Sequence, residues 1–230
     1  MFADYRANRY GEEILTDWGS ALIYRPIGIT LAWLLTATRI TPNAVTATGA
    51  LLLPSMLAMA VLFQPAAALA SVLVLAVVYL VLDCTDGSLA RATGHVSVSG
   101  HYWDLVTDLA YRGCIYVIVG YLADQISPWP LPASQMSCMA LAAWFAALAR
   151  LARYNLERLA PAGNADQGKA AAFTAYSFLS GMDTLFPPLV ALAWAAGLLS
   201  FFIAWIVFYS FADVVLALLA ARERLRSYHG

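Results

Sequence analysis

Six long apolar segments limit the fold of this 230-residue sequence more than any other feature. A membrane-spanning helix needs about 20 apolar residues, and in lipid only helices and closed barrels satisfy every backbone hydrogen-bonding group. The composition agrees, since 62% of the residues are hydrophobic and 12% are charged. We therefore predict an all-α integral membrane protein with six transmembrane helices. They are expected near residues 43–63, 67–90, 101–123, 136–158, 170–196 and 201–221.

A further apolar segment covers residues 20–38, but Arg25, Pro26 and Gly28 interrupt it. Its apolar residues recur at near-helical spacing, which is typical of an amphipathic helix lying in a membrane interface. We expect such a helix here rather than a seventh span. The predicted organisation is an N-terminal cytoplasmic and interfacial segment over residues 1–40, followed by a six-helix transmembrane domain over residues 41–230.

The distribution of Lys and Arg predicts the orientation in the membrane. The loops near residues 64–66, 124–135 and 197–200 contain neither residue. Six spans with both termini in the cytoplasm place every Lys and Arg except Arg112 on the cytoplasmic side. A seventh span would break this pattern. The predicted location is therefore a cell inner membrane or its equivalent, with the lipid bilayer as a partner and no nucleic-acid partner.

Two pairs of aspartates are placed where neighbouring apolar segments meet the cytoplasm. Asp83 and Asp86 are three residues apart at the end of the second segment, and Asp104 and Asp108 are four apart at the start of the third. Either spacing places both carboxylates of a pair on one face of a helix. The link over residues 92–100 is short, so the two helices must be antiparallel neighbours. The two pairs are then expected to converge.

Four carboxylates at the edge of the hydrocarbon are costly, at roughly 2.5–3.5 kcal/mol for each charge at the centre of a membrane helix. Like charges also repel one another at short range. Arg91 and Arg112 are too few to compensate, which predicts one or two hard divalent cations. Oxygen ligands suit Mg²⁺, Mn²⁺ or Ca²⁺. Arg91 matches phosphate oxygens, and Gly87 and Ala90 leave space beside it, so we predict phosphoryl-group transfer from a diphosphate.

These residues form a pattern that resembles the signature of the CDP-alcohol phosphotransferases. The pattern is Asp83-x2-Asp86-Gly87-x2-Ala90-Arg91-x8-Gly100-x3-Asp104-x3-Asp108, with no departure from that signature. The resemblance extends more weakly to the six spans, the interfacial helix and the segment Thr41-Pro42-Asn43-x2-Thr46. It implies a transferase of phospholipid biosynthesis. Such an enzyme moves a phosphatidyl-type group from a CDP-lipid to an alcohol and releases CMP.

The same resemblance implies roles for individual residues. Asp83, Asp86 and Asp104 would hold Mg²⁺ or Mn²⁺, and Asp108 would share in that metal site or act as general base. The base role suits Asp108 because Arg112, one turn away, would keep it ionised. The family's behaviour also implies a homodimer. The residues implied to bind the CDP diphosphate and its nucleotide are Asp83, Gly87, Ala90, Arg91, Gly100, Asn43 and Thr46.

The acceptor alcohol is left open by two conflicting similarities. Residues 103–108, WDLVTD, are similar to eukaryotic phosphatidylinositol synthases, whereas residues 150–155, RLARYN, are similar to phosphatidylserine synthases. Inositol, inositol phosphate, serine and glycerol phosphate are the candidates. A basic cytoplasmic mouth would favour an acidic acceptor such as a phosphorylated polyol, although the same residues also suit membrane anchoring. The candidate acceptor-binding residues are Arg112, Arg150, Arg153 and Lys169.

Two further aspartates, Asp183 and Asp213, lie within apolar segments. They would bind the acceptor or form hydrogen bonds between helices. The three cysteines have no metal-type spacing, and their odd number argues against a disulfide framework. We expect them to be packing residues. His95 and His101, which flank the link between the aspartate pairs, are interpreted as solvated loop residues.

Three other functions compete with phosphatidyl transfer. A CDP-choline or CDP-ethanolamine phosphotransferase would use the same motif on a lipid alcohol. A divalent-cation transporter would need polar residues across the membrane, but the outer halves of the second and third segments are apolar. A catalytically inactive scaffold is disfavoured because the signature is intact.

Overall fold

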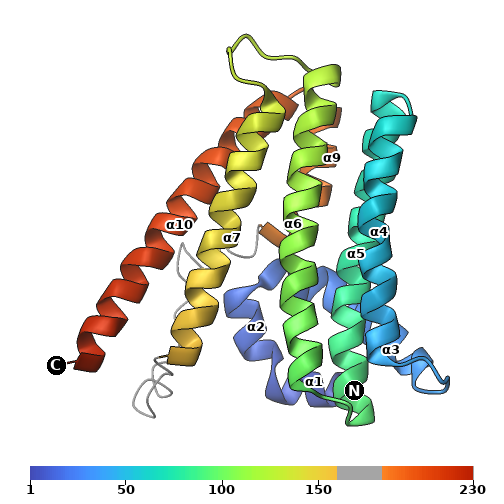
Figure 1. Cartoon of the computed structure of the whole chain (residues 1–230). Helices are drawn as coiled ribbons and strands as arrows, with labels where there is room; N and C mark the ends of the chain where they lie inside the picture. Colours follow the sequence, from blue (N-terminus) through green and yellow to red (C-terminus); the bar gives the residue numbers. More distant parts are fainter. Residues whose placement is uncertain (160–182, 230) are drawn as a thin grey trace. The chain divides into compact units, whose positions relative to one another are not determined.

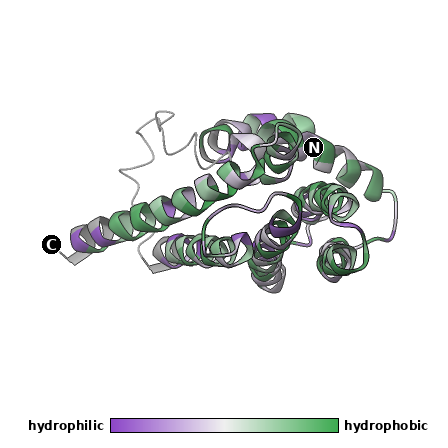
Figure 2. Ribbon diagram, turned by 90° about the horizontal axis from the view of Figure 1, so that it is seen from above, coloured by the Kyte–Doolittle hydropathy of each residue, from purple (hydrophilic) through white to green (hydrophobic). Residues whose placement is uncertain are grey.

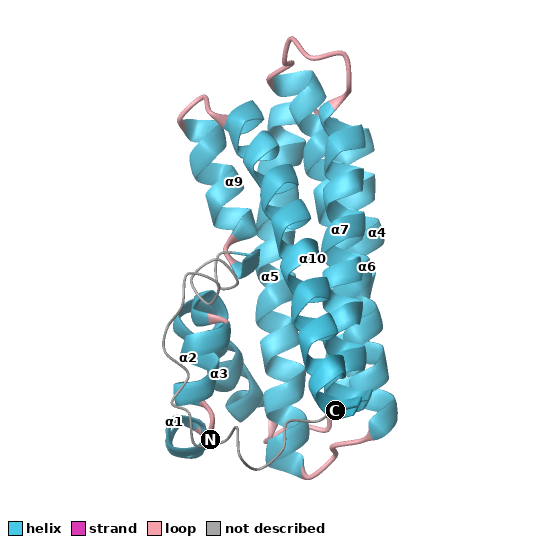
Figure 3. Ribbon diagram, turned by 90° about the vertical axis from the view of Figure 1, so that its left-hand side faces the viewer, coloured by secondary structure: helices cyan, strands magenta, loops and turns pink. Residues whose placement is uncertain are grey.

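The computed structural model describes residues 1–159 and 183–229, and this part of the chain is helical without any strand (Figure 3). The chain divides into two compact units. The first contains Met1–Tyr111 and the described part of Ala171–Leu192, and the second contains the described parts of Arg112–Ala170 and Ala193–Gly230. The helices are α1 (Phe2–Asn8), α2 (Tyr10–Thr16), η1 (Ser20–Tyr24, a π-helical turn), α3 (Arg25–Leu35), α4 (Pro42–Leu62), α5 (Pro65–Thr93), α6 (Val98–Ile126), α7 (Gln135–Leu159), α9 (Phe186–Ala195) and α10 (Leu199–His229).

Five of the described helices are long and apolar enough to cross a membrane, namely α4, α5, α6, α7 and α10. They coincide with five of the six predicted apolar segments, so the all-α membrane architecture is confirmed to that extent. The remaining predicted segment, residues 170–196, lies partly outside the described residues. Its described part contains α9, whose first turn holds Pro187 and Pro188. Proline is tolerated there because the first N–H groups of a helix have no intrahelical partner.

The N-terminal elements of the first unit pack on the polar end of α5. Figures 1 and 3 show α1, α2 and α3 beside the C-terminal half of α5. The backbones of α3 and α5 approach closely at Gly28, where a Cβ atom would lie 2.6 Å from Cβ of Cys84. The hydroxyl of Ser20 in η1 also lies near this residue, 3.5 Å from Sγ of Cys84. The N-terminal segment is therefore packed directly against the aspartate-bearing helix.

Residues Ser20–Leu35 form a continuous helical segment of η1 and α3, and the prediction of a helix in this region is confirmed. One face is buried, with Tyr24, Ile29 and Ala32 at 1%, 3% and 0% exposure. Apolar residues also cover the opposite, exposed face, including Ile27 and Trp33. The segment is shorter than α4, α5, α6, α7 and α10.

The second unit contains the pair of α7 and α10, which pack along each other. Ala149 of α7 and Val214 and Ala217 of α10 form a buried apolar cluster between them. Asp124 at the end of α6 accepts hydrogen bonds from the backbone N–H groups of Gln135 and Met136, at 2.8 and 3.1 Å, and so caps the start of α7. Figure 2 shows α10 coloured hydrophobic over most of its length and hydrophilic near its C-terminal end.

Candidate functional site

The connection between α5 and α6 is tighter than the sequence predicted. Helix α5 continues to Thr93, and α6 begins at Val98, so only residues 94–97 link them. Gly94 ends α5 in the left-handed region with φ of +70°, a conformation that glycine adopts without a Cβ penalty. His95 then donates its N–H to the carbonyl of Ala90 at 2.9 Å. This short link makes α5 and α6 consecutive helices whose aspartates lie at the same end.

The four aspartates of the motif all belong to the first unit and act on one another. The carboxylate of Asp83 interacts electrostatically with those of Asp108, Asp104 and Asp86. Asp86 is buried and Asp83 is half-buried. Among the described residues, however, no three His, Cys, Asp or Glu side chains lie close enough together to ligate one ion. The carboxylates therefore share one electrostatic environment without forming a closed ligand shell.

A hydrogen bond from α4 orients one of these acids. Thr46 donates its hydroxyl to Oδ2 of Asp86 at 2.5 Å. Thr46 is positioned by the start of α4, where Thr41 caps the helix by accepting a hydrogen bond from the N–H of Ala44 at 3.3 Å and Pro42 occupies the first turn. The sequence therefore brings Thr46 toward the acids through ordinary helix-start signals.

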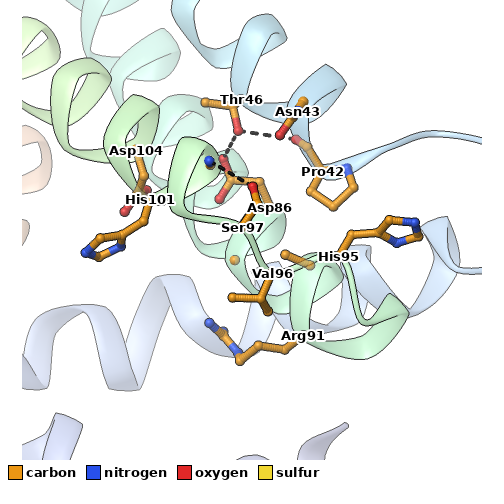
Figure 4. A pocket seen from close by; sticks show the side chains of 13 residues that line it. Pro42, Asn43, Thr46, Asp86, Arg91, His95, Val96, Ser97, His101 and Asp104 are labelled. Carbon is orange, nitrogen blue, oxygen red and sulfur yellow. Dashed lines mark hydrogen bonds between the residues drawn. The ribbon is translucent and has the colours of Figure 1, made fainter.

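A pocket of about 220 Å³ opens beside Asp86. Figure 4 shows Asn43 and Thr46 of α4, Asp86 and Arg91 of α5, and Asp104 of α6 around this space. Asp83 and Asp108 do not line it. The predicted site residues that do line it are Asn43, Thr46, Asp86, Gly87, Ala90, Arg91, Gly100 and Asp104.

Both histidines that flank the link also line this pocket, together with Val96 and Ser97. Their side chains are exposed, as the sequence predicted. His101, however, lies in the first turns of α6 rather than in the loop. The sequence contained one signal for their involvement, which was their position beside the aspartate motif. That position alone did not distinguish a solvated histidine from a pocket-lining one.

The side chain of Arg91 folds back over Gly87. It donates from Nη2 to the hydroxyl of Ser88 at 3.3 Å. A Cβ atom at Gly87 would lie 3.3 Å from Nη1 of Arg91, closer than most Cβ contacts. The missing side chain at Gly87 therefore gives the guanidinium room beside the pocket.

Arg25 is a charged neighbour of the acids, which the sequence analysis treated as an interruption of an apolar segment and as one of the basic residues on the cytoplasmic side. Its charge acts on Asp83 and Asp86. Its Nε donates to Glu13 at 3.1 Å, and Glu13 also accepts a 2.9 Å hydrogen bond from the hydroxyl of Tyr5. Burial opposes the charge of Arg25, but Cys84, Glu13 and Asp83 more than offset it and raise the pKa of Arg25. Arg25 is therefore a permanent cation on the N-terminal segment.

The candidate acceptor residues that the structure describes, Arg112, Arg150 and Arg153, belong to the second unit. Arg153 of α7 forms an ion pair with Asp213 of α10. This pairing corresponds to the helix-to-helix alternative for Asp213. Arg150 is exposed, and Lys169 lies outside the described residues.

The remaining predictions from the sequence concern Asp183 and the cysteines. Asp183 is half-buried, and its neighbour Thr184 donates a hydrogen bond to Asp17 at 2.6 Å. All three cysteines are free, and Cys84 is buried whereas Cys114 and Cys138 are half-buried.

The fold and the pocket together define an α-helical membrane protein with an acidic, arginine-containing polar site at the end of its helices. Comparison with known protein families matches residues 39–209 to CDP-alcohol phosphatidyltransferase. The match covers most of the chain, and the protein belongs to the CDP-alcohol phosphatidyltransferase family. A search among curated proteins found no match. Members of this family are transferases of phospholipid synthesis and generally depend on a divalent metal.

Proposed function

We propose that this protein transfers a phosphatidyl group from a CDP-lipid such as CDP-diacylglycerol to a small polar alcohol, with release of CMP. The observation that supports this most is the pocket in which eight residues predicted from the motif and from the start of α4 meet. It combines carboxylates, a guanidinium and two glycines, which suits a diphosphate and its counterions.

The donor is proposed to lie in this pocket with its diphosphate toward Arg91. Guanidinium groups bind phosphate oxygens through paired, charge-assisted hydrogen bonds. Gly87, Ala90 and Gly100 also line the pocket and present little or no side chain, so phosphate groups can approach the backbone closely. Asn43 is proposed to contact the nucleotide from α4, with Thr46 beside it.

The chemistry of the acids fits a hard divalent cation. Asp83, Asp86, Asp104 and Asp108 offer only oxygen ligands, which Mg²⁺ and Mn²⁺ prefer, and their negative charges lie within range of one another. Their side chains would have to rotate toward a common point to ligate one ion. A bound Mg²⁺ or Mn²⁺ would supply neutralisation of the charge on the diphosphate.

The proposed reaction is a displacement at the phosphorus that bears the lipid. The acceptor hydroxyl oxygen forms a new bond to that phosphorus, the bond to the oxygen that bridges both phosphorus atoms breaks, and CMP leaves with that oxygen. Asp108 is proposed to take the proton of the attacking hydroxyl as general base. Its place on α6, one turn beyond Asp104, keeps it beside the other acids.

Inositol, inositol phosphate, serine and glycerol phosphate are the proposed acceptors. Arg112, Arg150, Arg153 and Lys169 are the proposed acceptor-binding residues. Because Asp213 compensates the charge of Arg153, the net positive charge of this set is smaller than the sequence alone indicated. The acceptor screen below therefore includes neutral and zwitterionic alcohols beside the phosphorylated ones.

The membrane arrangement proposed for this function has six spans and an interfacial helix over η1 and α3. Both termini and the pocket would face the cytoplasm, where CDP-lipids and soluble alcohols meet. The family further suggests a homodimer. The exposed apolar face of α3, which includes Ile27 and Trp33, supports the interfacial placement because such a face is stable only against lipid or protein.

Purified protein in lipid–detergent micelles tests the donor and acceptor. CMP release is measured with CDP-diacylglycerol and each acceptor, with a no-acceptor control, in the presence of Mg²⁺ or Mn²⁺. We expect acceptor-dependent CMP release with CDP-diacylglycerol. Release only with CDP-choline or CDP-ethanolamine plus diacylglycerol would replace the proposed donor. Metal uptake into liposomes without any CDP turnover would indicate transport instead.

The variant Asp108→Asn tests the proposed base. It keeps the size of the side chain but cannot accept a proton, so we expect turnover to fall by about 10² to 10⁴, the range of general-base catalysis. The thermal midpoint of unfolding should stay near that of the wild type. Asp4→Asn, an exposed acid on α1, is the matched control and should retain full activity. Near wild-type turnover in Asp108→Asn would remove this residue from the mechanism.

A further inference from the structure

Two tyrosines, about one helical turn from the aspartates, form a ring contact between α5 and α6. The rings of Tyr79 and Tyr111 are stacked, with centroids 4.1 Å apart and an interplanar angle of 6°. Both side chains are buried, with Tyr79 at 3% and Tyr111 at 5% exposure. The hydroxyl of Tyr111 also donates to the backbone carbonyl of Ala76 on α5 at 3.5 Å. This stacked aromatic contact connects the two helices that carry the motif.

Each tyrosine is close in sequence to one aspartate of the motif. Tyr79 precedes Asp83 by four residues, and Tyr111 follows Asp108 by three. Residues three or four apart share a helix face, so each ring lies on the same face as an acid and about one turn farther from the link over residues 94–97. The hydroxyl of Tyr79 is accordingly within electrostatic range of Asp83, Asp108 and Asp104.

The third helix of the pocket meets the same stack. Gly49 of α4 faces Tyr79, and a Cβ atom there would lie 3.6 Å from two carbons of the ring. Gly49 is three residues after Thr46, which binds Asp86. Helix α4 therefore contacts α5 at two levels, through Thr46 at Asp86 and through Gly49 at the ring of Tyr79.

We propose that Tyr79 and Tyr111 are positioning residues, whose stacked rings set the register of α5 against α6 so that the two aspartate pairs face each other. Neither tyrosine lines the donor pocket, so both act through the acids. The inference rests on the proposed function of those aspartates. Aromatic pairs prefer defined relative orientations, so this contact favours one register of the two helices over others.

Kinetics of ring-removing and ring-keeping variants test this role. Tyr79→Leu and Tyr111→Leu should each lower kcat about tenfold or more, since small misplacements of reacting groups are costly, with KM for the CDP-lipid changed less than about twofold. Tyr79→Phe and Tyr111→Phe keep the rings and should stay within about twofold of the wild type. The double variant Tyr79→Leu, Tyr111→Leu should be no slower than the worse single variant, because both remove one contact.

Leu69→Ala is the control for a general loss of stability. Leu69 is fully buried on α5 ten residues before Tyr79, so its truncation lowers the thermal midpoint without disturbing the acids. Its kcat at a temperature where it is folded should equal that of the wild type. Equal losses of kcat in Leu69→Ala and Tyr79→Leu would overturn the positioning role. If Tyr79→Phe is as slow as Tyr79→Leu, the effect is due to the hydroxyl, and the proposed role of the stacked rings is wrong.

Mn²⁺ binding, followed by electron paramagnetic resonance without any CDP-lipid, provides a readout apart from activity. Tyr79→Leu should weaken Mn²⁺ binding at least about fivefold, and Tyr79→Phe should not. If the wild type shows neither CMP release nor Mn²⁺ binding, the proposed function fails. The stacked contact is then tested by thermal midpoints of unfolding alone. If the effects of Tyr79→Leu and Tyr111→Leu on the midpoint are strictly additive, the two rings are not energetically coupled and the proposal is wrong.

Discussion

At the scale of single residues, the site is organised by hydrogen bonds and charges that reach the acids from other helices. Asp86 is buried at 7% exposure and receives the hydroxyl of Thr46. A buried carboxylate without such a partner would be costly. Arg25 adds a positive charge near Asp83 and Asp86 from the N-terminal segment. The family match begins at residue 39, so this contribution lies outside the matched region.

Thr46→Val tests the hydrogen bond to Asp86. The substitution keeps the shape of the side chain and removes the donor, and a hydrogen bond to a charged group contributes about 1.5–3 kcal/mol. We expect kcat/KM for the CDP-lipid to fall about tenfold or more. Thr46→Ser keeps the hydroxyl and should stay within about threefold of the wild type. Equal activity in Thr46→Val and the wild type would show that Asp86 does not depend on this donor.

At the scale of elements, α5 combines a long apolar helix with half of the aspartate motif. Its first two thirds are apolar, and its last turns carry Asp83, Asp86 and Arg91. The polar end can be buried because η1 and α3 pack on it, with Gly28 allowing close approach of the backbones. Removing that packing would expose Cys84 and the neighbouring acids to water or lipid.

Gly28→Ala tests the α3–α5 contact. The added Cβ would lie 2.6 Å from Cβ of Cys84 and 3.0 Å from its carbonyl carbon, so backbone must move. Overpacking of this kind costs about 1–3 kcal/mol, and we expect a lower thermal midpoint and faster alkylation of Cys84. In Gly11→Ala, where nothing lies within 4 Å of the added atom, stability should be unchanged or slightly higher. A Gly28→Ala protein with wild-type stability and Cys84 reactivity would contradict the packing.

The ion pair between α7 and α10 gives a second prediction at this scale. Arg153 and Asp213 are 32% and 15% exposed, so removing one partner leaves a poorly solvated charge. We expect Arg153→Met and Asp213→Leu each to lower the free energy of unfolding by about 1–3 kcal/mol, between the values for exposed and fully buried pairs. The double variant should be more stable than the sum of the single effects predicts. Arg150→Met, at an exposed position on the same helix, is the control, and additive single effects would contradict the pairing.

At the scale of the whole molecule, the basic residues predict which loops face the cytoplasm. Single cysteines in a variant lacking Cys84, Cys114 and Cys138 test this. We expect Ala133→Cys, in the loop after α6, to react with a membrane-impermeant maleimide in intact cells. Ala37→Cys, just after α3, should react only once the membrane is permeabilised. Both positions are exposed, so the reverse labelling pattern would contradict the predicted orientation.

The sequence by itself determined the helical membrane architecture and the family. Hydropathy and helical spacing are local properties, so five predicted segments coincide with α4, α5, α6, α7 and α10. The motif was readable because its residues lie within two consecutive helices with a short link. The same locality explains why most predicted pocket residues lie together around Asp86.

Only the tertiary structure decided which distant residues meet. Thr46 and Asp86 are 40 positions apart, and Arg153 and Asp213 are 60 positions apart. Neither pairing follows from local spacing, because it depends on which helices pack together and in what register. In the sequence alone, Arg25 is an interruption of an apolar segment and Tyr79 is one of many aromatic residues. Packing of α3, α5 and α6 placed both residues beside the aspartates. Protein interiors are closely packed, so the neighbours of a buried side chain depend on which helices pack against its own helix.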